Sequence, residues 1–255
     1  MKHYEGYLID LDGTMYRGKE KIEEAVEFVK ELAAREIPYL FVTNNSSKTC
    51  AQVAEHLLEM GIPATQKHVF TTSIATAKFI AEEKQHASVY MIGEEGLKDA
   101  IEKQGFTIKD EDVDYVVVGI DREITYEKLA KACLAVRGGA KFISTNGDIA
   151  LPTERGLMPG NGSITSVITV STETAPIFIG KPESIIVDQA LEVIGTPREK
   201  TVMVGDNYNT DIMAGINANM DTIMVHTGVT SKEQLSTYKK QPTFSIDSLS
   251  EWKFL

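Results

Sequence analysis

The stretch Tyr7-Leu8-Ile9-Asp10-Leu11-Asp12-Gly13-Thr14 joins a short apolar run to two acids and a glycine. The apolar run predicts a buried strand, and Gly13 allows a sharp turn directly after the acids. Because side chains two residues apart in a strand point to the same side, Asp10 and Asp12 are expected to face one point at the strand's end. Carboxylates so close repel each other unless a cation or a shared proton separates them. Taken alone, the stretch is equally compatible with a strand that ends in an ordinary acidic turn.

Three other apolar runs also end in polar groups. They are Tyr39–Val42 before Thr43, Ile177–Gly180 before Lys181, and Thr201–Gly205 before Asp206, with Asp211 a little further on. In an open parallel sheet, ligands bind beyond the carboxyl ends of the strands. The four run ends therefore predict a single site assembled from distant parts of the sequence.

The composition is that of an acidic globular protein. Of its 255 residues, 42% are hydrophobic and 25% are charged, which suits one large domain or two ordinary ones. A net charge of -11 and a pI near 5.0 disfavour a surface that binds nucleic acid or an anionic membrane.

The sequence has no pattern typical of export or of a membrane span. The start of the chain lacks an apolar core, and no run approaches the ~20 apolar residues of a membrane-spanning helix. Cys50 and Cys133 lie far apart and make neither a disulfide framework nor a metal cluster. We therefore expect a cytoplasmic protein with free thiols and with no nucleic-acid or membrane partner.

Strand-like runs alternate with helical patterns along nearly the whole chain, which is typical of an α/β fold with a parallel sheet. The patterns predict helices over residues 22–36, 48–60, 73–85, 94–104, 125–137, 183–195, 209–218 and 231–239. Further strand-like runs cover residues 69–72, 89–92, 115–118, 142–144 and 222–225. Residues 163–170 are rich in β-branched side chains, but the spacing of Ile164, Val167 and Ile168 favours a helix.

The order of the run ends predicts an inserted domain. Two run ends lie before residue 47 and two after residue 180, so a site built from both halves leaves the middle of the chain as an insertion. Polar breaks near residues 82–85 and 171–174 set its bounds. We expect a discontinuous core of residues 1–81 and 176–255, and an inserted domain of residues 82–175, which is an ordinary domain size.

The acids Asp10, Asp12, Asp206 and Asp211 predict a site for a hard divalent cation, because carboxylates crowded at one sheet edge need a positive charge. Mg²⁺ fits best, since it takes one or two protein carboxylates, retains waters and shares its site with phosphate oxygens. The five histidines are scattered and lack the spacing of a zinc site.

Lys181 and Thr43 add an ammonium and a hydroxyl, which are suited to hold a phosphate dianion. Two plainer interpretations stay open: Lys181 as a counter-ion of the acids, and Thr43 as a helix N-cap. Together the groups predict phosphoryl transfer. Asp10 would attack phosphorus and form an aspartyl-phosphate, while Asp12 would act first as general acid and then as general base.

These motifs resemble the four ordered motifs of the haloacid-dehalogenase (HAD) superfamily, and most closely its NagD-like branch of p-nitrophenyl-phosphatase-like and acid-sugar-phosphatase-like enzymes. The resemblance rests on Asp10-Leu11-Asp12-Gly13-Thr14, Thr43-Asn44-Asn45, Gly180-Lys181-Pro182 and Gly205-Asp206 with Asp211. It extends over nearly the full chain, and residues 144–148 with 159–162 resemble the cap loop of that branch.

The resemblance implies an α/β fold, with a Rossmann-like HAD core around a parallel sheet and an inserted α/β cap domain of the C2 type. It also implies Asp10 as nucleophile and Asp12 as acid and base, with Mg²⁺ held by the Asp10 carboxylate, the Asp12 backbone carbonyl and Asp206. The other residues that it singles out are phosphate or substrate contacts (Thr43, Asn44 and Lys181), supporting residues (Asp211 and Asn207) and cap contacts (Asn146 and Asp148). Arg17 falls where the family has a short flap, so a gating role and a plain surface position are both open.

Two other functions fit the same fold. A phosphomutase usually carries a small helical cap after the first motif, whereas only residues 14–20 separate that motif from the next helix here. A non-catalytic sugar-phosphate-binding protein is disfavoured by intact Asp10, Asp12, Lys181 and Asp206. We therefore expect a phosphatase for a small phosphorylated metabolite, whether a sugar phosphate, a nucleotide or an aryl phosphate. Such families often dimerise through their caps, so a homodimer stays open.

Overall fold

The computed structural model describes residues 3–254, which form two compact units. The first unit consists of residues 3–43, 51–70 and 181–254, and the second of Asn44–Cys50 and Thr71–Gly180. The insertion predicted over residues 82–175 lies wholly inside the second unit, which also contains residues 44–50, 71–81 and 176–180 that the prediction gave to the core. The division into a hydrolase core and an inserted cap stays a prediction.

The first unit is built on a six-stranded sheet with the strand order β15-β14-β13-β1-β4-β5. Its strands are β1 (Gly6–Ile9), β4 (Tyr39–Thr43), β5 (Val69–Thr71), β13 (Thr201–Gly205), β14 (Asp221–Val225) and β15 (Phe244–Ile246). The central strand β1 is parallel to both β4 and β13, and every one of its residues is buried. Continuous burial explains why these strands appear in the sequence as unbroken apolar runs rather than as alternating patterns.

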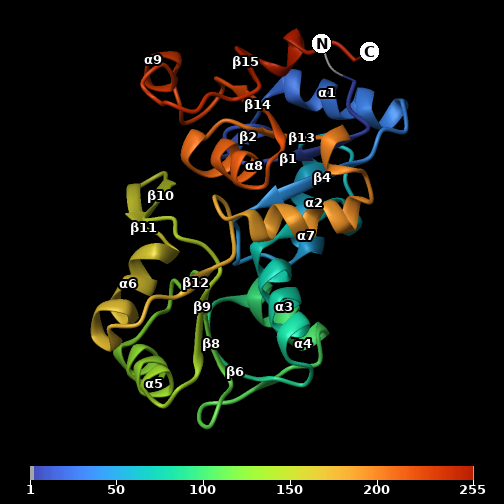
Figure 1. Cartoon of the computed structure of the whole chain (residues 1–255). Coiled ribbons are helices and arrows are strands. Elements are labelled where there is room, and N and C mark those ends of the chain that lie inside the picture. The colour runs from blue at the N-terminus through green and yellow to red at the C-terminus, as the bar shows by residue number, and fades with distance from the viewer. Residues whose placement is uncertain (1–2, 255) are drawn as a thin grey trace. The chain divides into compact units, whose positions relative to one another are not determined.

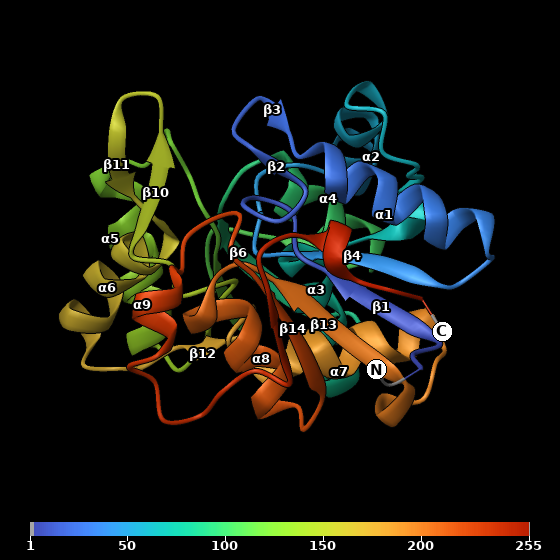
Figure 2. The same ribbon diagram turned by 90° about the horizontal axis from the view of Figure 1, so that it is seen from above.

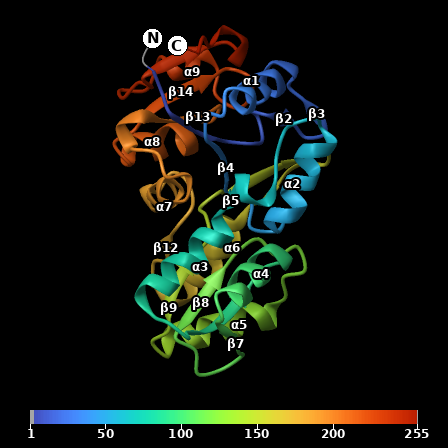
Figure 3. The same ribbon diagram turned by 90° about the vertical axis from the view of Figure 1, so that its right-hand side faces the viewer.

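Helices cover both faces of this sheet. They are α1 (Glu23–Ala34), α2 (Cys50–Glu59), α7 (Ser184–Ile194), α8 (Met213–Asn217) and α9 (Lys232–Leu235). Figures 2 and 3 show α1 and α2 on one side of the strands, with α7 and α8 on the other. In α1 the buried residues Ala25, Val26, Val29 and Leu32 recur at helical spacing, which is the pattern that predicts the helix.

The second unit has its own parallel sheet, with the order β12-β9-β8-β6-β7. Its strands are β6 (Ser88–Ile92), β7 (Thr107–Ile108), β8 (Tyr115–Val118), β9 (Lys141–Ser144) and β12 (Ile177–Phe178). Its helices are α3 (Thr72–Glu83), α4 (Glu95–Lys103), α5 (Tyr126–Arg137) and α6 (Asn161–Thr172). Figure 1 shows α3 and α4 on one side of the strands, with α5 and α6 on the other. The chain is thus a mixed α/β protein with parallel sheets, as predicted, and residues 163–170 are helical.

Two small antiparallel hairpins escape the sequence patterns because each strand is too short to show a period. They are β2 (Tyr16–Arg17) with β3 (Glu20–Lys21), and β10 (Ala150–Thr153) with β11 (Gly156–Pro159). The hairpin of β2 and β3 follows the Asp10–Thr14 stretch directly, so it adjoins the predicted site.

The helix predicted over residues 231–239 is too long. The structure ends α9 at Leu235, and nearby side chains then take the carbonyl groups that a longer helix would use. The hydroxyls of Ser236 and Thr237 donate to the carbonyls of Glu233 and Gln234, and Gln241 donates to the Leu235 carbonyl. Side-chain hydrogen bonds of this kind compete with helix formation.

The helix predicted over residues 209–218 is not regular. Its first turn, Tyr208–Ile212, is a π-helix, and the α-helical part α8 begins only at Met213. Turns of this type are rare and occur frequently at functional sites. No helix within residues 3–254 is both long enough and apolar enough to cross a membrane.

Candidate active site

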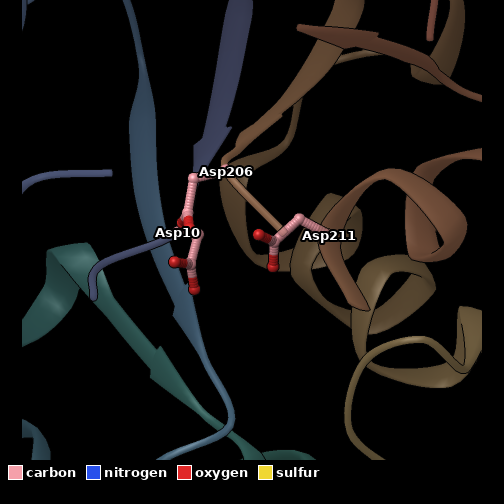
Figure 4. Close-up of side chains that lie close together, drawn as sticks. All are labelled: Asp10, Asp206 and Asp211. Carbon is pink, nitrogen blue, oxygen red and sulfur yellow. The ribbon is translucent and has the colours of Figure 1, made fainter. Parts of the chain in front are cut away.

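Four charged side chains meet in the first unit, and we call them the acidic cluster: Asp10, Asp206, Asp211 and Lys181. One carboxylate oxygen from each of the three acids lies within 4.8 Å of the others, and Figure 4 shows their side chains gathered beyond the strand ends. Asp10 follows β1 and Asp206 follows β13, two neighbouring parallel strands whose carboxyl ends lie at one sheet edge. The structure therefore brings these four predicted residues together.

Lys181 supplies the positive charge of the acidic cluster. Its side chain is 2% exposed, and its ammonium contacts the Asp10 carboxylate, Asp211 Oδ1 at 2.8 Å and the Val42 carbonyl oxygen at 2.9 Å. Burial lowers the pKa of Lys181, but the charges of Asp10 and Asp211 outweigh that effect and raise the pKa above its ordinary value. Lys181 is thus a counter-ion of these acids, which the sequence left open. Its contact with a phosphate stays a prediction.

Asp206 is completely buried and held on both carboxylate oxygens. Its Oδ1 accepts a hydrogen bond of 3.0 Å from the Thr14 hydroxyl, and its Oδ2 accepts one of 2.7 Å from the Val229 backbone N–H. Burial, and next the charge of Asp211, raise the pKa of Asp206 to about 6, against the opposing effect of these hydrogen bonds. Burial and the charge of Asp211 also raise the pKa of Asp10, although Lys181 opposes the shift.

The acidic cluster has the donor set of a hard-cation site. It combines three carboxylates with one ammonium, that of Lys181, which contacts Asp10 and Asp211, so the ionised cluster carries excess negative charge. The raised pKa values of Asp10 and Asp206 are the consequence of that excess under burial. Carboxylate oxygens are the ligands that hard divalent cations prefer, so the residues present are able to hold such an ion.

The π-helical turn fixes the direction of Asp211. Its Oδ2 accepts a 3.0 Å hydrogen bond from the Asn207 backbone N–H, while its Oδ1 lies 2.8 Å from the Lys181 ammonium. The Asn207 side chain in turn accepts from the Asn209 backbone N–H at 3.0 Å and so caps the turn. Both residues therefore have a structural task close to Asp10 and Asp206, and the supporting roles predicted for them at the metal stay predictions.

Asp12 differs from Asp10 in its surroundings. The Asp12 side chain is exposed, and it is not one of the three grouped acids, whereas Asp10 is 9% exposed. Gly13 has a φ of +96°, and a Cβ at this position would collide with the Asp206 carboxylate. The turn after Asp12 thus requires glycine, both for its backbone conformation and for the close approach.

Thr43 is buried at the end of β4, and α2 begins only at Cys50, so Thr43 does not cap that helix.

The sequence analysis missed a fifth loop of this site, residues 227–230 after β14. Val229 donates its backbone N–H to Asp206, and the Thr227 hydroxyl donates to the Gly13 carbonyl oxygen at 2.7 Å. Arg17 donates from Nε to the Thr227 carbonyl oxygen, so the β2–β3 hairpin is tied to the same loop and Arg17 has a definite anchoring contact. The apolar run over residues 222–225 ends in polar residues like the other four, and that signal identifies the loop.

The remaining predicted residues, Asn44, Asn146 and Asp148, lie together in the second unit. Asp148 Oδ2 accepts hydrogen bonds from the side-chain amides of Asn44 at 3.1 Å and Asn146 at 2.6 Å. Asn161 is a buried residue of the stretch 159–162 that the resemblance quoted without a role for it, and it donates towards the Ser144 and Thr145 hydroxyls and the Val118 and Asn146 carbonyls. We call Asn161, Ser144, Thr145 and Asn146 the Asn161 cluster.

Comparison with known proteins agrees with this geometry. Residues 7–107 match the haloacid dehalogenase-like hydrolase family, and residues 178–252 match a HAD-hydrolase-like family. The protein named 5'-nucleotidase YutF of Bacillus subtilis is 66% identical over 252 residues, covering 99% of this chain and 98% of its own length. The chain belongs to the haloacid dehalogenase-like hydrolase family. It is an enzyme of the phosphatase type, as predicted, with relatives named nucleotidase and phosphatase.

Other members of the family are similar along the whole chain. An acid sugar phosphatase of Staphylococcus saprophyticus is 54% identical, covering 98% of this chain and 97% of its own. The crystal structure of a double mutant of the thermostable NPPase from Geobacillus stearothermophilus superposes with a TM-score of 0.95 at 59% identity, with full coverage of both chains. A putative p-nitrophenyl phosphatase from Bacillus subtilis gives a TM-score of 0.91 at 65% identity, covering 99% of this chain and 96% of that one. The resemblance to the NagD-like phosphatases is therefore confirmed.

Proposed function

We propose that this chain is a Mg²⁺-dependent phosphatase that hydrolyses small phosphomonoesters through an aspartyl-phosphate on Asp10. One observation carries the proposal: three buried carboxylates lie within 4.8 Å of one another around the Lys181 ammonium, at the end of the strand that Asp10 follows. The names of the relatives support nucleotides, sugar phosphates and aryl phosphates as substrate classes.

The proposed nucleophile is Asp10, because it stands at the junction of the acids and the ammonium. Asp10 Oδ2 or Oδ1 would attack phosphorus in line, which forms the acyl phosphate and breaks the bond to the leaving oxygen. Lys181 and the Thr43 hydroxyl would hold the equatorial phosphoryl oxygens, where charge gathers in the transition state. Asp10, Asp206 and the Asp12 backbone carbonyl would hold Mg²⁺, which when bound supplies positive charge for the phosphoryl oxygens.

Asp12 is the proposed proton carrier. It would protonate the leaving oxygen in the first step, then accept a proton from the water that hydrolyses the aspartyl-phosphate. The structure gives this assignment a physical basis, because the Asp12 carboxylate is exposed and stands apart from the three grouped acids. A carboxyl that must exchange protons with a substrate and with water needs such access.

Two alternatives remain testable against this proposal. A phosphomutase would use the same aspartyl-phosphate but would return the phosphoryl group to a sugar, and a binding protein would release no phosphate at all. The relatives named phosphatase and nucleotidase favour hydrolysis over both. The prediction that Asn44, Asn146 and Asp148 contact the substrate stays a prediction, as does a homodimer.

Release of inorganic phosphate from p-nitrophenyl phosphate tests the proposal directly. We expect turnover with Mg²⁺, none with EDTA, and recovery when Mg²⁺ is added back. Asp12→Asn should abolish turnover but leave Mg²⁺ affinity nearly unchanged, because only the backbone carbonyl of Asp12 is assigned to the metal. Phosphate release that is equally fast with EDTA contradicts the metal dependence, and loss of Mg²⁺ affinity in Asp12→Asn contradicts the division of roles.

A further inference from the structure

Tyr16 lies beside the acids of the site but has no part in the chemistry proposed above. It is the first residue of β2, two positions after Thr14, and it forms an isolated backbone bridge with Asp12. Its carbonyl oxygen accepts a 2.7 Å hydrogen bond from the Gly13 backbone N–H. The backbone of Tyr16 is thus joined to the very turn that positions Asp12.

The hairpin that carries Tyr16 is anchored on both sides. Its second residue, Arg17, donates to the Thr227 carbonyl oxygen, and the Thr227 hydroxyl donates to the Gly13 carbonyl oxygen. Antiparallel pairing joins Tyr16 to Lys21 in β3. These contacts hold the position of the Tyr16 ring relative to Asp12, which a side chain on a free loop would not keep.

The ring of Tyr16 is half-buried and packs against one other ring. The His56 imidazole on α2 meets it edge to face, with ring centroids 5.4 Å apart and planes inclined by 78°. Among residues 3–254, the Tyr16 hydroxyl makes no hydrogen bond, so it is available to a bound molecule.

We propose that Tyr16 is a specificity-determining residue that contacts the leaving group of the substrate and favours aromatic leaving groups over aliphatic ones. The inference rests on the proposed function, because the side of the site next to Asp12 is the leaving-group side only if Asp12 protonates the leaving oxygen. A ring fixed there, backed by His56, offers a planar apolar surface to an aryl group attached at the ester oxygen. Offset or edge-to-face contacts between rings then add to the burial of apolar area.

Two small substrates separate this role from a general effect on catalysis. Phenyl phosphate carries a ring at the ester oxygen, and glycerol 1-phosphate has the same phosphoryl group without one. For each variant, kcat/KM on each substrate is divided by the wild-type value, so the different intrinsic reactivities of the two esters cancel. Inorganic phosphate as a competitive inhibitor reports on the phosphoryl site itself.

We expect Tyr16→Ala to lower kcat/KM about tenfold for phenyl phosphate, mainly through KM, which corresponds to about 1.4 kcal/mol. The value for glycerol 1-phosphate should change less than about twofold, and inhibition by inorganic phosphate should not change. Tyr16→Phe retains the ring and should stay within about threefold of wild type on both substrates. Tyr16→Leu fills the space without a ring, so it should show the same selective loss even if Tyr16→Ala folds poorly.

Two controls make the result specific. His56→Ala removes the edge-to-face partner and should give a smaller loss, about threefold, that is confined to phenyl phosphate. Tyr126→Ala removes a tyrosine of α5 that is 86% exposed, and it should change neither substrate. Equal losses on both substrates in Tyr16→Leu, or no loss on phenyl phosphate, overturn the assignment of Tyr16. If the wild-type enzyme releases phosphate from neither ester, the proposed function itself fails.

Discussion

Each unit of this protein gathers buried polar side chains beyond the carboxyl ends of parallel strands, but the two groups differ in charge. The acidic cluster combines three carboxylates with one ammonium, and burial shifts the pKa values of Asp10 and Asp206 upwards. The Asn161 cluster contains only hydroxyls, amides and carbonyls, and the Asn161 amide nitrogen lies within hydrogen-bond distance of four acceptors. The same strand-end arrangement therefore produces a charged cluster in one unit and a cluster of neutral hydrogen-bonding groups in the other.

The difference follows from the energetics of burial. Neutral polar groups cost less to bury than charges, even though Asn161 Oδ1 has no hydrogen-bond partner among the described residues. Buried charges in excess are unfavourable until a ligand of opposite charge binds, and such strain is typical of sites that bind metal ions and phosphoryl groups. We therefore expect the two clusters to respond oppositely to charge removal, metal and pH.

Removal of the ammonium should have the largest effect. Lys181→Met leaves three buried carboxylates without their counter-ion, so it should lower the free energy of unfolding by about 3–5 kcal/mol at pH 8 without metal. Urea unfolding measures the change, and phosphate release should fall at least ~1,000-fold. The matched control is Lys84→Met, whose half-exposed partner Asp114 lies 2.6 Å away; it should cost at most about 1 kcal/mol. Similar losses in both variants contradict the account of the acidic cluster.

Removal of the amide should have a smaller effect that pH does not change. Asn161→Leu removes the buried amide that donates towards the Val118 and Asn146 carbonyls and the Ser144 and Thr145 hydroxyls, and it should lower the free energy of unfolding by about 3 kcal/mol. The loss should be equal at pH 5 and pH 8, and equal with Mg²⁺ and with EDTA. The control is Asn217→Leu, which removes one exposed hydrogen bond from a side-chain amide to the Pro182 carbonyl. It should lower the free energy of unfolding by about 0.5 kcal/mol. A loss that varies with pH shows that the Asn161 cluster is not electrically neutral.

Mg²⁺ should stabilise the acidic cluster and should have no effect on the Asn161 cluster. At a free concentration near 100 times its dissociation constant, Mg²⁺ should raise the stability of the wild-type protein by about 2.7 kcal/mol. The thermal midpoint of Asp206→Asn should not respond to Mg²⁺, whereas that of Asn161→Leu should rise as much as in wild type. An equal rise in Asp206→Asn places the metal elsewhere.

The smallest expected effect is on the pH dependence of the metal-free protein. The pKa of Asp206 is raised to about 6, above its unfolded value, so the folded state binds this proton more tightly. The destabilisation is therefore present above pH 6 and is relieved as pH falls. When the pH is lowered from 7 to 5 in EDTA, the free energy of unfolding of the wild-type protein should rise by about 1 kcal/mol relative to that of Asp206→Asn, a variant without that carboxyl. If the difference in unfolding free energy between wild type and Asp206→Asn stays constant, or if the wild type loses stability relative to the variant as the pH falls, the raised pKa is contradicted.

The sequence predicts the charged part of this arrangement well, because Asp10 and Asp206 each directly follow an apolar run. Asp10 and Asp206 follow strands that are buried along their whole length, and parallel pairing then fixes where both carboxylates lie. The π-helical turn at Tyr208–Ile212 could not be predicted, since a single turn leaves no periodicity. The role of Val229 also escapes sequence patterns, because this residue acts through its backbone N–H. The resemblance groups residues 159–162 with residues 144–148, but the hydrogen bonds of Asn161 to that stretch become visible only in the structure.

The central claim is that Asp10 carries the phosphoryl group during turnover. Rapid acid quenching of the enzyme during hydrolysis of a ³²P-labelled phosphomonoester, followed by peptide mapping, measures it most directly. The account predicts covalent label on the peptide that contains Asp10 in wild type, and none in Asp10→Asn. Label on any other residue, or continued turnover by Asp10→Asn, contradicts the account.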